Sequence, residues 1–240
     1  MTIAYDGTRY QGWQRQATTD QTIQGILEKT ISSFIGYKVT IDGSGRTDAG
    51  VHAQGQTANV KIAGKIDEKV FQKTINEMLS EEIRICKTEL VKNSFHSRYA
   101  ARSKRYEYCI DQREKQDVFT RKYCYHYIER LNIKNMNAAA KILKGTHDFA
   151  AFTDKKDEKS TVRTIYDIQI TQKDEKIYLN FYGDGFMYHM VRILTGTLLE
   201  IGTGTIKVED LKEILRSKDR LKSGFLAPAE GLCLKEVRYE

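Results

Sequence analysis

The segment Asp42-Gly-Ser-Gly-Arg-Thr-Asp-Ala-Gly-Val-His-Ala53 lies between two stretches that have the pattern of β-strands. Tyr37–Ile41 precedes it, and after it the apolar residues 58, 60 and 62 alternate as in a half-buried strand. Its three glycines permit unusual backbone angles and the close approach of a large ligand. Because it also carries a carboxylate, a guanidinium and an imidazole, it is either a solvated hairpin connection or an active-site loop.

The sequence on both sides of this loop predicts a ferredoxin-like order of elements. Before it, a strand at Thr2–Tyr5 is followed by a helix whose apolar residues repeat every three or four positions from Ile23 to Phe34, with Gly36 closing it. After it, Asp67 can cap a second helix, and Ile83 and Ile85 alternate in a further strand. The order is therefore β-α-β-β-α-β.

The second half has a comparable mixture of elements. Its predicted strands are 105–110, 162–171, 176–182 and 232–239, and its predicted helices are 133–143, 188–199 and 208–215. Tyr106, Tyr108 and Ile110 alternate along the first strand and share one face. We therefore expect an α+β protein of two related halves, an N-terminal domain of residues 1–101 and a C-terminal domain of residues 102–240.

Composition excludes some classes of protein and favours a polyanionic partner. Of the 240 residues, 40% are hydrophobic and 30% are charged, which suits a folded core and disfavours both disorder and membrane insertion. We expect no signal peptide, since Thr2-Ile-Ala-Tyr5 has no basic or apolar leader. The net charge of +7 suits binding to phosphates. The four cysteines form no C-x-x-C pair, so we expect reduced thiols, without a zinc site or a disulfide framework.

The glycine-rich segment does not match the common phosphate-binding loops. No Gly-Lys-Ser/Thr ends it, as a P-loop requires, and no helical pattern follows it, as a dinucleotide-binding fingerprint requires. Gly43-Ser-Gly-Arg-Thr-Asp-Ala-Gly-Val-His-Ala53 instead resembles the signature loop of the TruA family of tRNA pseudouridine synthases. The resemblance continues in Tyr5-Asp-Gly-Thr-x-Tyr-x-Gly-Trp-Gln14, in Phe95-His-Ser-Arg98 with Lys104-Arg-Tyr-Glu-Tyr108, and in Phe186-Met-Tyr-His-Met-Val-Arg192.

The resemblance implies a fold and a function. The fold would be two ferredoxin-like or RRM-like halves with antiparallel sheets, joined into a pseudouridine synthase fold with the active-site cleft between them. The enzyme would be an isomerase that converts uridine to pseudouridine at positions 38, 39 and 40 of the tRNA anticodon stem-loop. It would act as a cytoplasmic homodimer on tRNA, without a membrane, a metal or an organic cofactor.

The resemblance also assigns roles to particular residues. Asp48 matches the essential aspartate, Tyr106 the tyrosine that packs on the target base, and Arg192 the basic residue that pairs with the aspartate. Arg46 matches the arginine that helps to hold the nucleotide out of the stack. The remaining expected substrate-binding residues are Tyr106 again and, from the signature loop, Gly45, Thr47 and His52. The Thr47 hydroxyl and the His52 imidazole have the alternative of serving their own loop.

Physical arguments support part of this assignment. Arg192 lies in the apolar run 186–199, where a buried guanidinium needs an anionic partner, and Asp48 would provide one. Such an arginine would lower the pKa of the carboxylate and keep it ionised at neutral pH. Alternation alone does not choose between Tyr106 and Tyr108.

Two other functions remain as alternatives. A non-catalytic tRNA-binding protein or chaperone of the same fold would be expected to have replaced Asp48, Tyr106 or Arg192, and the sequence retains all three. A phosphate-binding hydrolase would need a loop lysine or a cluster of metal-binding carboxylates. The basic stretch Lys155-Lys-Asp-Glu-Lys159 is a further candidate for contact with tRNA.

Overall fold

The computed structural model describes residues 1–155 and 160–240, in two compact units. Unit 1 contains residues 1–102 together with 233–240, and unit 2 contains residues 103–232. The last strand of the chain is thus grouped with the first half, whereas the sequence placed it in a domain of residues 102–240. The tRNA contact expected for Lys155–Lys159 falls almost wholly on residues 156–159, outside the described ranges.

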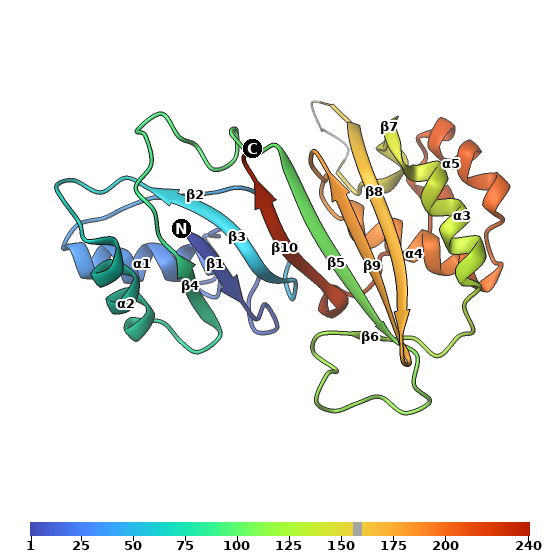
Figure 1. Ribbon diagram of the computed structural model, residues 1–240, viewed down its shortest axis with the longest axis horizontal. Coiled ribbons are helices and arrows are strands. Elements are labelled where there is room, and N and C mark those ends of the chain that lie inside the picture. Colours follow the sequence, from blue (N-terminus) through green and yellow to red (C-terminus); the bar gives the residue numbers. More distant parts are fainter. Residues whose placement is uncertain (156–159) are drawn as a thin grey trace. The chain divides into compact units, whose positions relative to one another are not determined.

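Unit 1 has the β-α-β-β-α-β order that the sequence predicted, with one strand added from the end of the chain (Figure 1). Its elements are β1 (Thr2–Tyr5), α1 (Ile23–Ile35), β2 (Ile41–Gly43), β3 (His52–Val60), α2 (Glu68–Met78), β4 (Ile83–Lys87) and β10 (Leu232–Arg238). Both helices begin at capping side chains: Thr22 accepts a hydrogen bond from the Gly25 N–H, and Asp67 accepts two from the next helical turn. Gly36 ends α1 in the left-handed conformation, as predicted.

The sheet of unit 1 has the strand order β4-β1-β3-β10, and β2 also pairs with β3. β1 lies antiparallel to both β3 and β4, with Thr2 opposite Thr57 and Tyr5 opposite Ile83. The predicted strand 37–41 was wrong for residues 37–40, since β2 begins only at Ile41. β3 is longer than predicted, because pairing with β1 extends it back to His52.

The last strand, β10, is parallel to β3, in addition to the expected antiparallel pairs that β3 forms with β1 and β2. Cys233 lies opposite His52, and Leu234 lies opposite Ala53. The close approach depends on Gly55, where a Cβ atom would lie 2.3 Å from the carbonyl oxygen of Lys235. β10 thus supports the strand that directly follows the glycine-rich loop.

Unit 2 is a second α+β unit, whose described residues form a mainly antiparallel sheet and α-helices (Figure 1). Its strands are β5 (Ser103–Asp111), β6 (Tyr125–His126), β7 (Gly145–Asp148), β8 (Val162–Lys173) and β9 (Lys176–Gly183). Its α-helices are α3 (Ile133–Leu143), α4 (Met190–Thr203) and α5 (Leu211–Ser217), and short 3-10 helices lie at Ala150–Phe152, Val208–Asp210, Arg220–Lys222 and Ala229–Gly231. The two short strands β6 and β7 were not predicted.

The main sheet of unit 2 has the order β5-β9-β8-β7, with β6 added parallel to β5. Along β9 the residues alternate, and Ile177, Leu179 and Phe181 are fully buried. α4 is apolar on nearly all sides and forms the central helix of this core. The α+β fold class predicted from the sequence is confirmed.

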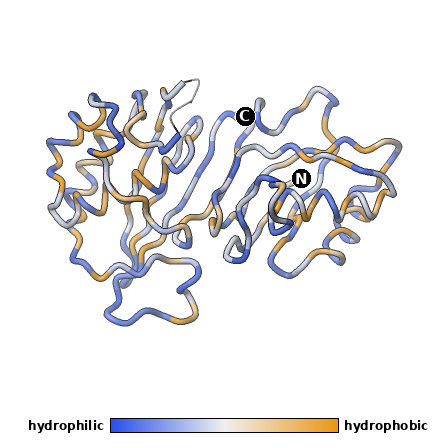
Figure 2. Tube along the Cα trace, turned by 180° about the vertical axis from the view of Figure 1, so that it is seen from behind, coloured by the Kyte–Doolittle hydropathy of each residue, from blue (hydrophilic) through white to orange (hydrophobic). Residues whose placement is uncertain are grey.

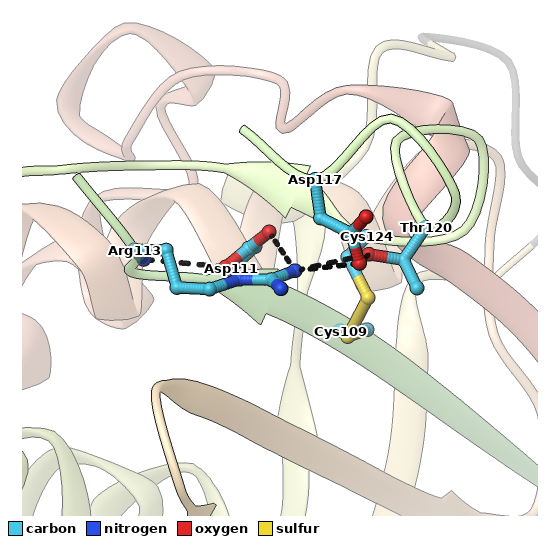
Figure 3. The surroundings of a disulfide bond; sticks show 6 residues. All are labelled: Cys109, Asp111, Arg113, Asp117, Thr120 and Cys124. Carbon is cyan, nitrogen blue, oxygen red and sulfur yellow. Dashed lines mark hydrogen bonds and ion pairs between the residues drawn. A yellow bond between two sulfur atoms is a disulfide. The ribbon is translucent and has the colours of Figure 1, made fainter. Parts of the chain in front are cut away.

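A loop of residues 112–124 leaves the end of β5 and returns to β6 (Figure 1). Figure 2 shows it as mainly hydrophilic, with a short hydrophobic stretch. A disulfide between Cys109 and Cys124 closes it, with the two Cα atoms 4.6 Å apart (Figure 3). The expectation of reduced thiols was wrong for this pair, because the parallel pairing of β5 with β6 brings together cysteines that no sequence motif links. Cys86 and Cys233 are free thiols, as expected.

None of the helices within residues 1–155 and 160–240 is both long enough and apolar enough to cross a bilayer.

Candidate active site

The glycine-rich loop between β2 and β3 is held in place by backbone hydrogen bonds from the segment 10–13. The Trp13 N–H donates to the carbonyl of Thr47 over 3.0 Å, and the Gly50 N–H donates to the carbonyl of Tyr10 over 3.2 Å. Gly12 is needed for this contact: its φ is +88°, and a Cβ atom would lie 2.6 Å from the Thr47 oxygen. The loop that carries the predicted catalytic aspartate therefore has a fixed backbone on both sides.

Side chains at the start of the loop face the interior of unit 1. The buried Ser44 hydroxyl donates to Gln56 Oε1 over 2.7 Å, and Gln56 Nε2 donates to the Gly45 carbonyl over 3.1 Å. The buried Thr47 Oγ1 lies 2.8 Å from the hydroxyl of Tyr5, and burial raises the pKa of that tyrosine. Two of the expected substrate-binding residues thus have partners inside unit 1. The hydroxyl of Thr47 points into the core, and the carbonyl of Gly45 accepts a hydrogen bond from Gln56.

Arg46 and Asp48 are both more exposed than Thr47, which lies between them. Arg46 is exposed, and its Nε donates to Gln14 Oε1 over 2.9 Å, so that the rest of the guanidinium projects beside the N-terminal segment. Asp48 is half-buried, and its backbone carbonyl accepts from the Val51 N–H over 3.2 Å. Within the signature loop, Ser44 and Thr47 are thus buried, whereas Arg46 and Asp48 retain exposure.

His52, the first residue of β3, is buried and turns its imidazole toward the segment after β1. Its Nδ1 accepts from the Gly7 N–H over 3.0 Å and lies 3.3 Å from Asp6 Oδ1. His52 thus has a structural task in unit 1, and a contact with substrate remains a prediction.

In unit 2, the geometry separates the two tyrosines that sequence pattern could not distinguish. Tyr108 is fully buried, its hydroxyl donates to the Pro228 carbonyl over 2.7 Å, and burial raises its pKa. Gly231 packs so closely on its ring that a Cβ there would lie 2.6 Å from the ring carbons. Tyr106, further back along β5, is 8% exposed and meets Phe186 edge-on, with ring centroids 5.3 Å apart.

Arg192 lies in the first turn of α4 and is half-buried. Its Nε donates to the Ala227 carbonyl over 2.7 Å, and its own carbonyl accepts from the Ala227 N–H over 3.3 Å. The segment 223–227 runs close along α4, since a Cβ at Gly196 would lie 1.9 Å from the Phe225 oxygen. The guanidinium is thus oriented by a backbone carbonyl of its own unit.

A cluster at the start of α4, which the sequence did not reveal, holds the helix in place. His189 precedes the helix with φ of 62°, a conformation that L-residues seldom adopt. Its Nδ1 lies 2.6 Å from Asp154 Oδ2, and Arg220 Nε donates to the other oxygen of Asp154 over 2.8 Å. Burial opposes ionisation of Asp154, but these two partners keep its pKa below the ordinary value. The three residues lie far apart in sequence, which is why no local motif indicated them.

The described residues contain no group of three or more His, Cys, Asp or Glu side chains that could hold a metal ion. A cavity of about 950 Å³ opens in unit 1 between β3, α2 and the residues after β4. It is lined by none of the predicted site residues.

Comparison with known proteins finds the same family along most of the chain. The sequence profile of the family described as tRNA pseudouridine synthase matches residues 1–100 and 139–240. These ranges include Asp48 and Arg192, whereas Tyr106 lies in the unmatched segment 101–138.

Individual relatives match the chain over its full length. It is 43% identical to "tRNA pseudouridine synthase A" of Thermoanaerobacter sp. (strain X514), over 99% of this chain and 97% of that protein. It is 44% identical to the protein of the same name from Bacillus sp. (strain KSM-64), with the same coverage. It is 45% identical to "tRNA pseudouridine synthase A 2" of Clostridium tetani (strain Massachusetts / E88), over 99% of this chain and 96% of that protein.

A solved structure, a Cbf5-Nop10-Gar1 complex, aligns with 84% of this chain and 45% of its own. The TM-score of 0.40 and the identity of 9% are too low to support an assignment.

Proposed function

Since the chain belongs to the tRNA pseudouridine synthase family, we propose that it isomerises uridine to pseudouridine in tRNA. The family match across both Asp48 and Arg192 carries this proposal. The substrate uridines would be those at positions 38, 39 and 40 of the anticodon stem-loop, and the enzyme would act as a homodimer in the cytoplasm. Neither a metal nor an organic cofactor is part of the proposal.

The reaction cleaves the N1–C1′ glycosidic bond, turns the uracil and forms a C5–C1′ bond, after which the proton at C5 is lost to solvent. N1 gains a proton, so that the product is an isomer of the substrate. Asp48 would supply the carboxylate, acting either as a nucleophile or as the base that removes a ribose proton. Its position in a loop with a fixed backbone supports this role, because a catalytic group must be held in the reacting geometry.

A uridine stacked in a helix offers no access to C1′ or C5, so the enzyme would flip it out of the stack at a cost of a few kcal/mol. Tyr106 would recover roughly 1–3 kcal/mol by stacking on the extruded base. Tyr108 is fully buried with Gly231 against its ring, whereas Tyr106 retains 8% exposure, which favours Tyr106 for this role. Arg46 would hold the flipped nucleotide, and Arg192 would keep Asp48 charged. Gly45, Thr47 and His52 would support the loop and line the substrate site.

Release of tritium from tRNA labelled as [5-³H]uridine tests the activity, because the C5 hydrogen leaves as the new bond forms. We expect release by the wild type, none by Asp48→Asn, and full release by Asp20→Asn, a matched change at an exposed aspartate of unit 1. Absence of release by the wild type with all uridine-containing tRNAs would refute the function. Full activity of Asp48→Asn would refute only the assignment of the catalyst.

The alternative of a non-catalytic tRNA-binding protein predicts tRNA affinity without tritium release. Sites of modification are read by mass mapping of tRNA from cells that lack the protein. The homodimer is tested by light scattering at several concentrations, and a monomer at all of them would contradict it.

A further inference from the structure

The base of the loop 112–124 is clamped by more than its disulfide (Figure 3). Arg113 Nε and Nη2 donate to the two oxygens of Asp111 over 2.8 and 2.7 Å, in a bidentate pair. Asp111 is only 2% exposed, and the hydrogen bonds from Arg113 lower its pKa. The loop therefore leaves the sheet in a defined direction.

The tip of the loop is also ordered. Asp117 accepts hydrogen bonds from the Phe119 N–H, the Thr120 hydroxyl and Arg113 Nη2, at 3.0, 3.0 and 3.1 Å. Its backbone carbonyl accepts from the Arg121 N–H over 2.9 Å, which closes a turn at residues 118–123. Asp117 thus acts as a cap inside the loop, and Arg113 connects the cap to the base.

This ordered backbone presents aromatic and basic side chains to solvent. Phe119 is 87% exposed and Tyr123 is 47% exposed, and Lys115 and Arg121 are exposed beside them. The loop carries four basic residues against two acidic ones. Val118, next to Phe119, is also 59% exposed, so the loop presents a group of apolar side chains rather than a single one, and such a group indicates a binding surface.

Alternation of cations and aromatic rings is the composition that binds nucleic acid, because cations bind phosphates and rings stack on bases. A second copy of this chain is the less favoured occupant, since two such loops would bring like charges together. The loop lies in the segment 101–138, outside the ranges that the family profile matches.

We propose that the loop 112–124 is a tRNA-binding surface, on which Phe119 and Tyr123 stack against bases while Lys115 and Arg121 bind phosphates. The proposal deepens the proposed function and rests on it, since it takes tRNA as the polyanion bound.

Exposed side chains can be replaced without disturbing the fold, which makes the test direct. Phe119→Ala should raise the dissociation constant for unmodified tRNA about tenfold, the effect of losing one base-stacking contact. In tritium release, the larger part of the loss should be in KM rather than in kcat. Leu221→Ala, which removes an apolar side chain that is 92% exposed elsewhere in unit 2, should leave both unchanged.

The basic residues are tested separately, through the salt dependence of tRNA affinity. The double variant Lys115→Gln, Arg121→Gln should reduce the slope of log affinity against log salt by about two, one for each lost phosphate contact. Lys212→Gln, at an exposed position of α5, is the control and should leave the slope unchanged.

The outcomes separate this proposal from the proposed function. If the wild type releases tritium but the loop variants bind tRNA as tightly as it does, the loop proposal is overturned and the function stands. If the wild type releases none while Phe119→Ala still weakens tRNA binding, the function fails and the binding surface stands. If Phe119→Ala changes the molecular mass in solution and tRNA affinity falls only with it, the loop is an interface between copies and the proposal is overturned.

Discussion

Reduction of the Cys109–Cys124 disulfide should lower the stability of the protein by a predictable amount. The two cysteines are 15 residues apart in sequence, and the chain-entropy relation for a loop of this length gives about 3 kcal/mol. Reduction is the cleaner perturbation, because both side chains are buried and replacing them would also alter packing. The bidentate Arg113–Asp111 pair remains after reduction, so the effect arises mainly from the greater freedom of the unfolded chain.

The assay is urea unfolding of the same preparation with and without a thiol reductant. A loss of about 3 kcal/mol is a large part of the 5–15 kcal/mol typical of a folded domain. Titration of thiols in the denatured, unreduced protein should find two, from Cys86 and Cys233. Four titratable thiols, or equal stability in the two conditions, would refute the reasoning.

Three further predictions concern the core, the acid stability and the candidate stacking residue. Gly196→Ala should lower the free energy of unfolding by about 1–3 kcal/mol, because its Cβ would clash with the Phe225 carbonyl; an unchanged melting temperature would contradict this contact. Arg113 holds the pKa of Asp111 below its usual value. The ionised Asp111 should therefore stabilise the folded state above about pH 4, and this contribution should be lost as the pH falls through the lowered pKa. Asp111→Asn should therefore have a lower free energy of unfolding than the wild type at neutral pH, and this difference should become smaller in acid. A difference that does not depend on pH would contradict the role of the Arg113–Asp111 pair. Tyr106→Phe retains the ring against Phe186, so tRNA affinity measured by fluorescence anisotropy should change little, and a tenfold loss would argue against stacking as its main role.

Long periodic segments were predictable from sequence, whereas short or non-local ones were not. The helix 133–143 was predicted with its observed ends, since its apolar period is uninterrupted. β6 has two residues and therefore shows no periodicity at all. The disulfide depends on the parallel pairing of β5 with β6, and the grouping of β10 with unit 1 depends on a pairing between segments far apart in the chain.

The sequence predicted which residue types make up the candidate site, but not the directions in which their side chains point. The sequence identified the loop around Asp48, because carboxylate, guanidinium and glycines concentrate there. It did not reveal that Thr47 turns inward to Tyr5, or that His52 accepts from a backbone N–H. Such orientations depend on contacts with the segment 5–13, which periodicity and motif do not encode.

The parallel pairing of β10 with β3 has a consequence for folding during synthesis. The ribosome finishes β3 long before β10, because residues 61–231 must be made between them. At usual elongation rates this takes on the order of 10 s, during which the start of β3, at His52 and Ala53, lacks the partner that β10 provides. An open edge invites pairing with other chains, so we expect the nascent protein to be most prone to aggregation in this interval. The strand beside the Asp48 loop would thus gain its last neighbour only after unit 2 has been synthesised.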